Sequence, residues 1–136
     1  MSSLAGKVVV IIGGTTGIGC AATTACLEAG ARVVVVGSEA AEVGAARVLA
    51  ADARDPATAP RAIAEAVREF RGFDALYHVA GGSGRKWGDG PVHELSDEGW
   101  AKTIEAIPAA INNTCCAVAR NSVRLCRPGL RSATAT

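Results

Sequence analysis

The sequence predicts an α/β fold, a doubly wound parallel sheet with helices on both faces. Short apolar segments without polar alternation, such as residues 8–12 and 33–36, are typical of strands buried on both sides in a parallel sheet. These segments alternate with stretches of helical periodicity. The resulting order βαβαβαβα implies parallel strands joined by right-handed crossovers. We therefore expect an incomplete sheet of about four strands in the spatial order 3-2-1-4.

The first third of the chain contains two strands and the helix between them. Residues 7–12 form the first strand, and a helix over residues 17–29 follows, with small side chains along one face. Gly30 is a typical C-terminal stop for this helix. Residues 32–36 are apolar after the first position and form the second strand.

The middle of the chain continues the alternation with shorter elements. Ser38 is a candidate N-cap for a short helix over residues 39–46. Residues 48–50 form the third strand. Pro56 suits the first turn of the next helix, which has one apolar face and extends to Arg71. Residues 74–79 form the fourth strand.

A glycine-rich loop and a long helix follow the fourth strand. Residues 81–90 hold five glycines and have little intrinsic structure. Ser96 caps a long helix over residues 96–121, along which apolar side chains recur at helical spacing: Trp100, Ile104, Ile107, Ile111, Cys115 and Val118. We expect one domain over residues 1–127 and an irregular tail over residues 128–136.

Composition excludes several classes of partner. The chain has 14 basic and 13 acidic residues, and a net charge of +1 gives no electrostatic reason to expect nucleic acid or an anionic membrane.

The cysteines are odd in number and form no Cys-x2-Cys motif, which favours small buried thiols over disulfides or a metal site: Cys20, Cys26, Cys115, Cys116 and Cys126. Without a signal peptide or a long apolar span, we expect a soluble cytoplasmic protein.

The glycine-rich turn at residues 13–19 is the strongest functional signal. It reads Gly-Gly-Thr-Thr-Gly-Ile-Gly between a strand and a helix, the context that binds a dinucleotide pyrophosphate. Gly13 allows a sharp turn, while Gly17 and Gly19 allow close approach of phosphate and of helix to strand. The N–H groups near Gly17 and Ile18 would then face the anion. The alternative is a tight turn without a ligand.

The spacing Gly-x3-Gly-x-Gly resembles that of the short-chain dehydrogenase/reductase family, and the resemblance extends from about residue 5 to about residue 127. Residues 52–53, Asp-Ala, match the pair that contacts adenine in that family. Residues 78–81, His-Val-Ala-Gly, stand where the family has Asn-Asn-Ala-Gly, and Trp100 matches an aromatic residue of the long helix. Ile12 departs from the usual Thr. The resemblance implies a Rossmann-like fold and NAD(P)-dependent oxidoreduction of a carbonyl or hydroxyl.

The resemblance also implies a cofactor site. Its residues lie in the glycine turn and after the second, third and fourth strands: Gly13, Thr15, Thr16, Gly17, Ile18, Gly19, Gly37, Ser38, Asp52, Ala53, Ala80 and Gly81. Members that prefer NAD usually have an acidic residue at the position of Gly37. Members that prefer NADP often have a basic residue at Ser38 or Thr16. Neither is present, and Glu39 would repel a 2′-phosphate only if it pointed inward. The choice stays open, with a slight preference for NADP.

The family's catalytic residues have no match in this sequence. Its members use a Tyr, a Lys four residues later and a Ser, whereas the single tyrosine here is Tyr77, with Gly81 four residues on. The lysines are Lys7, Lys86 and Lys102. Ile107 replaces an Asn that supports proton relay. We expect no catalytic residue and no metal ligand, and His78 is more consistent with a structural hydrogen-bonding role than with catalysis.

The fifth strand of the family should begin near residue 127, where the pattern is lost. A truncated or frame-shifted gene would look this way, and the coding DNA downstream would then contain a Tyr-x3-Lys motif. Without that strand, we expect association, as a homo-oligomer or otherwise, through the 96–121 helix and the open edge of the fourth strand. The alternatives are a non-catalytic dinucleotide-binding or dimerisation module, and a non-functional fragment.

Overall fold

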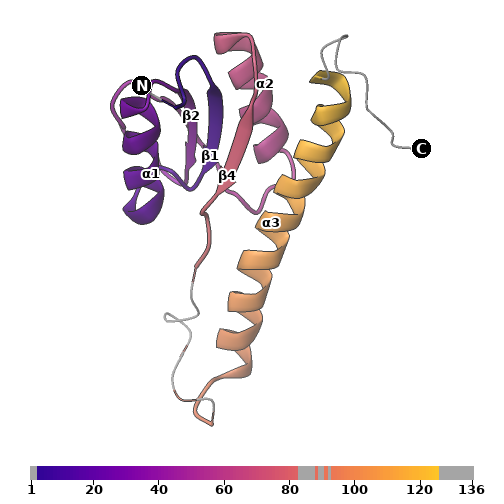
Figure 1. The fold of residues 1–136 in the computed structure, drawn as a ribbon. Coiled ribbons are helices and arrows are strands. Elements are labelled where there is room, and N and C mark those ends of the chain that lie inside the picture. The colour runs from indigo at the N-terminus through magenta and orange to yellow at the C-terminus, as the bar shows by residue number, and fades with distance from the viewer. Residues whose placement is uncertain (1–2, 83–87, 89–90, 92, 126–136) are drawn as a thin grey trace, which may run out of the picture.

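The computed structural model describes residues 3–82, 88, 91 and 93–125, except for the side chains of residues 106–109 and 120–125. Its elements are β1 (Val8–Ile12), α1 (Gly17–Glu28), β2 (Arg32–Gly37), β3 (Arg47–Ala50), α2 (Thr58–Phe70), β4 (Ala75–His78) and α3 (Asp97–Leu125). All strand pairs are parallel, and the sheet has the order β3-β2-β1-β4 (Figure 1). The predicted fold class and strand order are confirmed.

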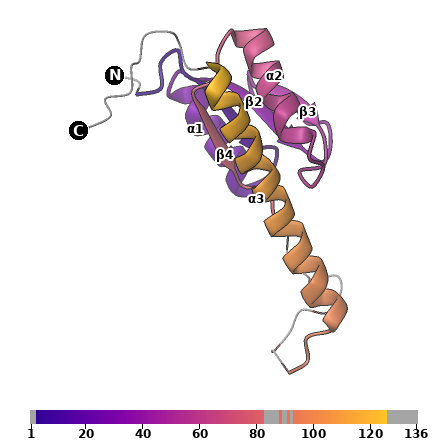
Figure 2. The ribbon, with the colours of Figure 1, turned by 90° about the vertical axis from the view of Figure 1, so that its right-hand side faces the viewer.

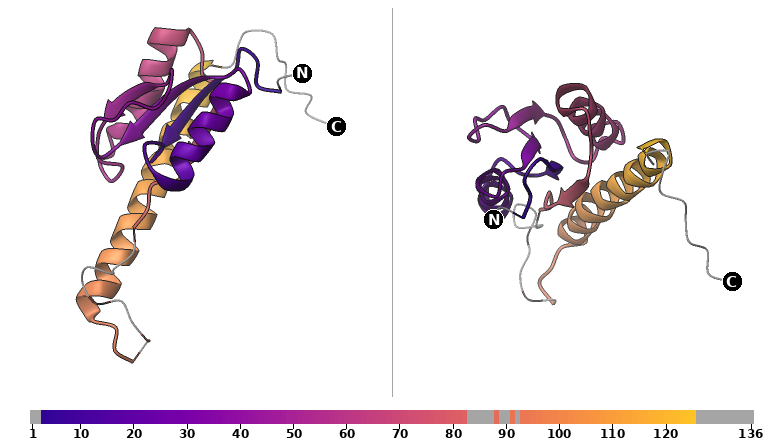
Figure 3. Two further views of the ribbon diagram at one scale, coloured as in Figure 1. Left: turned by 90° about the vertical axis from the view of Figure 1, so that its left-hand side faces the viewer. Right: turned by 45° about the horizontal axis from the view of Figure 1, so that its top comes forward.

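The two central strands are buried on both faces, which explains their unbroken apolar sequences. Every residue of β1 is buried, and so is every residue of β2 after Arg32. Val8, Val10 and Ile12 pack with α2, whereas Val9 and Ile11 pack with α1. Figure 3 shows α1 on one side of the sheet and α2 on the other. The sheet is therefore covered on both faces, as a doubly wound fold requires.

Glu65 joins α2 to the outer strand β3 through two arginines. Its carboxylate accepts hydrogen bonds from Arg47 Nε at 2.8 Å and from Arg68 Nε at 3.0 Å and Nη2 at 2.6 Å. The Glu65 side chain is 13% exposed. The hydrogen bonds from Arg68 and then from Arg47 lower the pKa of Glu65 from 4.5 to about 2.

Replacing Glu65 with Gln should make the chain less stable in a pH-dependent way. Because the folded-state pKa is about 2, below the ordinary value of 4.5, the ionised carboxylate stabilises the fold above pH 4.5. This contribution is lost as the pH falls from 4.5 toward 2. Urea unfolding of wild type and Glu65→Gln across this range should show a difference that shrinks with acidity. Glu69→Gln, whose carboxylate lies 3.9 Å from Arg68, is the matched control and should lose less. A pH-independent difference would contradict this.

Helix α3 packs against the rest of the chain through small side chains. Ala110, Thr114 and Ala117 are buried, and Ala117 contacts the cluster formed by Ala59 and Ile63 of α2. Gly99 N–H donates to Ser96 Oγ at 3.0 Å, which confirms Ser96 as the predicted cap. The first turns of α3 extend beyond the sheet (Figure 2).

An adjacent face of α3 carries larger apolar side chains that are exposed. Trp100, Ile104 and Ile111 are 59%, 47% and 44% exposed. On β4, Tyr77 is 45% exposed. The apolar side chains predicted along the helix are therefore present, but most of those that the structure describes are exposed to solvent.

The short helix predicted over residues 39–46 does not form. The segment between β2 and β3 is irregular, with a turn closed by Ala46 N–H donating to Val43 O at 3.0 Å. Gly44 has φ +51°, in the left-handed region that interrupts a helix. Val43 is buried at 7% exposure. Burial of one side chain at a left-handed turn outweighs the weak helix propensity of so short a segment.

The prediction of buried thiols is wrong for the four cysteines described. Cys115 and Cys116 are exposed, and Cys20 and Cys26 are half-buried. The small residues Ala110, Thr114 and Ala117 occupy the buried face of α3, so positions 115 and 116 turn outward. Cys126 and the predicted tail over residues 128–136 lie outside the described residues.

No helix within the described part of the chain is long and apolar enough to span a membrane. Across the same residues, no three His, Cys, Asp or Glu side chains are grouped as a metal site would require.

Candidate dinucleotide site

A cleft of about 860 Å³ opens at the carboxyl ends of the strands. Ligands of open parallel sheets bind at this edge. Eleven of the twelve residues predicted for the cofactor site line it: Gly13, Thr15, Thr16, Gly17, Ile18, Gly37, Ser38, Asp52, Ala53, Ala80 and Gly81. Gly19 is the exception, because it lies behind the turn against Gly13.

The glycine turn is hydrogen-bonded to β2 and lies close against the segment after β4. Gly13 N–H and Gly14 N–H both donate to Val36 O, at 2.8 and 3.1 Å. Gly13 has φ +88°, and a Cβ there would lie 2.5 Å from Ala80 N. A side chain at position 13 would therefore be strained and would also collide with the segment after β4. This is the sharp, close turn that the sequence predicts at Gly13.

Gly19 and Thr23 connect the turn to α1. A Cβ on Gly19 would fall inside contact distance of Gly13 O, with Gly14 Cα 2.9 Å away. Thr23 is fully buried, and its hydroxyl lies 3.1 Å from Gly14 O and 2.9 Å from Gly19 O. Thr23 was not predicted. The signal in the sequence is a threonine one turn after the last glycine of the motif.

The amino end of α1 opens into the cleft. Thr16, the N-cap, is extended and makes no side-chain cap hydrogen bond. Gly17 has φ +51° with open space around its Cα, and Ile18 is 74% exposed. The first-turn N–H groups of a helix have no intrahelical partner and lie at the positive end of the helix dipole. This end of the cleft is therefore suited to an anion.

The end of β2 explains why position 37 is glycine. A Cβ on Gly37 would overlap the side chain of Thr15. An acidic residue at position 37 would therefore require Thr15 to move. Ser38 lines the cleft, whereas Glu39 is exposed and does not line it.

Asp52 and Arg54 form an ion pair in the cleft wall beyond β3. Asp52 Oδ2 lies 2.6 Å from Arg54 Nη2, and Arg54 Nε lies 3.0 Å from both carboxylate oxygens. The Arg54 side chain, and then its backbone N–H, lower the pKa of Asp52. Thr58 Oγ1 donates to Asp52 O at 2.6 Å, and Asn113 Nδ2 of α3 donates to Arg54 O at 3.0 Å. The backbone is thus held on both sides of the pair.

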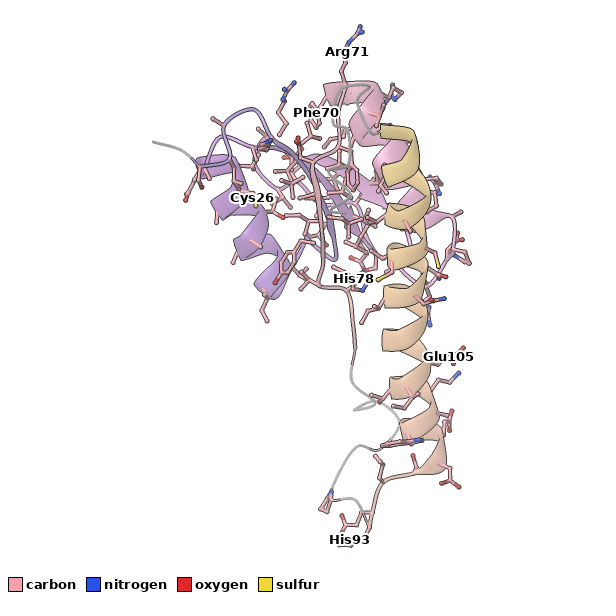
Figure 4. All side chains as sticks on the ribbon, turned by 45° about the vertical axis from the view of Figure 1, so that its right-hand side comes forward. Cys26, Phe70, Arg71, His78, His93 and Glu105 are labelled. Carbon is pink, nitrogen blue, oxygen red and sulfur yellow. The ribbon has the colours of Figure 1, made fainter. Side chains whose placement is uncertain are left out.

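His78 links the carboxyl end of β4 to α3. Its Nε2 lies 2.8 Å from Ala80 O and its Nδ1 lies 3.0 Å from Thr114 Oγ1. Because a carbonyl only accepts, Nε2 carries a proton and donates it to Ala80 O. Figure 4 shows His78 between the sheet and α3. Both ring nitrogens are occupied within the protein, in the arrangement expected of a structural histidine.

Sequence reasoning missed eight other residues of the cleft wall: Val36, Ala51, Arg54, Val79, Gly82, Lys102, Glu105 and Ala110. Several directly follow strands, so the general rule for parallel sheets would have found them. Lys102 and Glu105 come from α3, with Lys102 Nζ 4.0 Å from Glu105 Oε2. No local signal could place these two, because their approach to the cleft depends on how α3 packs against α2 and β4.

The sequence that forms this fold, including the glycine turn, matches a known family. The family model described as short chain dehydrogenase matches residues 7–124, which is most of the chain. The chain belongs to the short-chain dehydrogenase family. This confirms the family predicted from the glycine spacing. Short-chain dehydrogenases bind NAD(P) as a class.

Two relatives in sequence show the extent of the match. A 2,5-dichloro-2,5-cyclohexadiene-1,4-diol dehydrogenase of Sphingobium indicum is 36% identical over 119 residues, covering 79% of this chain and 46% of the relative. A short chain dehydrogenase/reductase of Macrophomina phaseolina is 34% identical over 115 residues, covering 76% of this chain and 64% of the relative. The chain thus spans about half to two-thirds of the length of these short-chain dehydrogenases.

Solved structures of short-chain dehydrogenases give the same picture. One from Mycobacterium avium superposes with a TM-score of 0.76 at 27% identity, covering 92% of this chain and 49% of that structure. The ligand-free aldohexose dehydrogenase of Thermoplasma acidophilum also gives a TM-score of 0.76, covering 90% of this chain and 47% of its own. At 20% identity, this second likeness concerns the fold alone.

Proposed function

We propose that this chain is the dinucleotide-binding part of a short-chain dehydrogenase that transfers hydride between NAD(P) and a CH–OH or carbonyl group. The observation that supports this is the cleft at the strand ends, into which the glycine turn and the amino end of α1 open. The relative from Sphingobium indicum acts, by its name, on a chlorinated cyclohexadienediol. This chain covers 46% of that relative, so only the class of reacting group is proposed here.

The proposed cofactor crosses the cleft from the third strand to the fourth. The pyrophosphate would lie at the amino end of α1, against Gly17 and Ile18, with Gly13 and Gly19 setting the close turn behind it. Asp52 and Ala53 would contact adenine, and Ala80 and Gly81 the ribose beside β4. The roles of these residues come from the family resemblance, and their common location at one cleft supports them.

We propose a modest preference for NADP over NAD. NAD binding usually uses a carboxylate at the end of the second strand, and Gly37, packed against Thr15, leaves no room for one without rearrangement. Ser38 lines the cleft and has a hydroxyl that could donate to a 2′-phosphate, while Glu39 does not line the cleft.

Binding without turnover is the expected behaviour of the purified chain. Calorimetric titration should show one saturable site for NADP and a weaker one for NAD, and reductase assays with generic carbonyls should stay at background, since the sequence has no Tyr-x3-Lys pair. Gly17→Glu, which places a carboxylate where the phosphates would lie, should weaken binding by about tenfold or more. Glu28→Gln at the other end of α1 is the control. Unchanged affinity in Gly17→Glu would contradict the proposed location.

We also propose that two copies associate through the exposed face of α3. Trp100, Ile104 and Ile111 recur at intervals that place them along one side of the helix, and burying such a face is favourable. Sedimentation should show a concentration-dependent dimer, and Ile104→Glu should shift it to monomer. Glu105→Gln, one position along, is the control. A monomer at all concentrations would contradict this proposal, and a monomer that also binds no dinucleotide would favour a non-functional fragment.

A further inference from the structure

The ion pair between Asp52 and Arg54 determines which hydrogen-bonding groups the adenine end of the cleft presents to a purine base. An ionised carboxylate only accepts hydrogen bonds, and its two oxygens provide about four acceptor positions. Three N–H groups of Arg54 are directed at the two oxygens, one of them shared between both, which leaves about one acceptor position for a donor on the base. Oδ1 accepts from Arg54 N at 2.8 Å and from Nε at 3.0 Å, and Oδ2 accepts from Nε at 3.0 Å and from Nη2 at 2.6 Å.

The pair is accessible and its backbone is held in place. The Arg54 and Asp52 side chains are 62% and 50% exposed, and both residues line the cleft. Thr58 and Asn113 hold the carbonyls of residues 52 and 54, at 2.6 and 3.0 Å. The loop therefore presents the guanidinium and the carboxylate together, side by side, at the cleft surface.

A guanidinium has five N–H donors. In Arg54, the N–H of Nε and one N–H of Nη2 are directed at Asp52. Three further N–H groups remain on Arg54 beside the carboxylate. A 6-aminopurine such as adenine presents an N–H donor at this edge, which suits Asp52. A 6-oxopurine presents an oxygen acceptor at C6, beside an N–H donor at N1. A lone carboxylate could accept only from N1 and would repel the C6 oxygen, whereas a guanidinium beside it would donate to that oxygen.

We propose that Arg54 makes the base end of this cleft tolerant of a 6-oxopurine, so that dinucleotides carrying hypoxanthine in place of adenine bind nearly as well as those carrying adenine. This inference rests on the proposed dinucleotide site and adds a specificity-determining residue to it. Arg54 neutralises the charge of Asp52 and supplies the donor that a 6-oxo group needs. The choice between adenine and hypoxanthine is thus set by two neighbouring side chains, of which Asp52 accepts hydrogen bonds and Arg54 donates them.

The test compares NAD⁺ with nicotinamide hypoxanthine dinucleotide, which differ in the group at C6 of the purine and in the hydrogen on N1. We expect wild-type dissociation constants within about threefold of each other, because either base finds a partner. In Arg54→Met the guanidinium is lost while the backbone carbonyl that Asn113 binds is kept. We expect the preference for NAD⁺ to rise to about tenfold or more, through weaker binding of the hypoxanthine ligand.

Two further variants separate charge from geometry. Arg54→Lys keeps the charge without the planar fork and should give an intermediate preference. Arg71→Met is the matched control, because Arg71 follows the far end of α2 and points away from the molecule (Figure 4). It should leave the ratio of the two dissociation constants unchanged.

The outcomes distinguish this inference from the proposed function. If wild type binds NAD⁺ but rejects the hypoxanthine ligand by tenfold or more, or if Arg54→Met leaves the ratio unchanged, the inference is overturned while the dinucleotide site stands. If wild type binds neither ligand, the proposed function is overturned and the inference with it. Circular dichroism of each variant confirms that a changed ratio is measured on folded protein.

Discussion

Gly19→Ala is expected to destabilise the fold by about 3 kcal/mol or more, because the new methyl group would meet backbone rather than a movable side chain. A Cβ at this position would overlap Gly13 O, with Gly13 C 2.8 Å and Gly14 Cα 2.9 Å away. Relief would require α1 to move away from the turn, which would also break the contact of the buried Thr23 hydroxyl with Gly14 O. Urea unfolding followed by far-UV circular dichroism measures the loss.

Gly17→Ala is the matched control for this prediction. Gly17 has a positive φ of +51°, but a Cβ there would meet nothing within 4 Å. Its cost should therefore be limited to the left-handed backbone, about 1–2 kcal/mol. A Gly19→Ala protein as stable as Gly17→Ala would show that α1 does not approach the turn as closely as described.

Ile63→Ala is expected to lower the free energy of unfolding by about 2–5 kcal/mol, the usual cost of emptying a filled core position. Ile63 is 1% exposed and lies in the cluster with Ala59 and Ala117, against Phe73 and Leu76. It is thus a main contact between α2 and α3. Because Asn113 and Thr114 of α3 hold Arg54 and His78, loss of Ile63 should also loosen the cleft wall.

Urea midpoints test this effect, and amide hydrogen exchange in α3 tests its consequence. Protection along residues 110–118 should fall in Ile63→Ala more than in the control Val67→Ala. Val67 is on the same helix and is 36% exposed, so its truncation should cost clearly less. Equal losses in the two variants would contradict the importance of Ile63 for the docking of α3.

The strand order and the cleft could be predicted from the sequence because both follow from local signals and general rules. The apolar segment Val8–Ile12 and the residues of Arg32–Gly37 identify the two central strands, and right-handed crossovers then fix the order. The glycine turn is also local, since Gly13 and Gly17 have the positive φ values that glycine permits. Residues after parallel strands necessarily meet at one edge of the sheet.

The failures involve contacts between distant segments. A segment such as residues 39–46 has enough helix-forming residues to predict a helix, but burial of Val43 beside a left-handed Gly44 decides its path. On α3, Cys115 was predicted to be a buried thiol, but it is exposed. The face with the small residues Ala110 and Ala117 packs against the fold, because small side chains let the helix approach α2 closely.

Arg54 and Thr23 were missed for a related reason. Each has an ordinary residue type for its position, and its importance comes from partners that only the fold brings near. Asn113, which holds Arg54 O, is 59 residues away along the chain. Thr23 depends on a turn nine residues earlier.

Mapping a dinucleotide onto backbone amides by ¹⁵N chemical shifts tests the central claim most directly. On addition of NADP or ADP-ribose, saturable shifts should concentrate at Gly17, Ile18 and Ser38, then at residues 52–54 and 80–81, and amides of residues 61–71 in α2 should stay unchanged. Gly17→Glu should abolish this pattern at the same ligand concentration. Absence of saturable shifts, or shifts centred away from the amino end of α1, would contradict dinucleotide binding at this cleft.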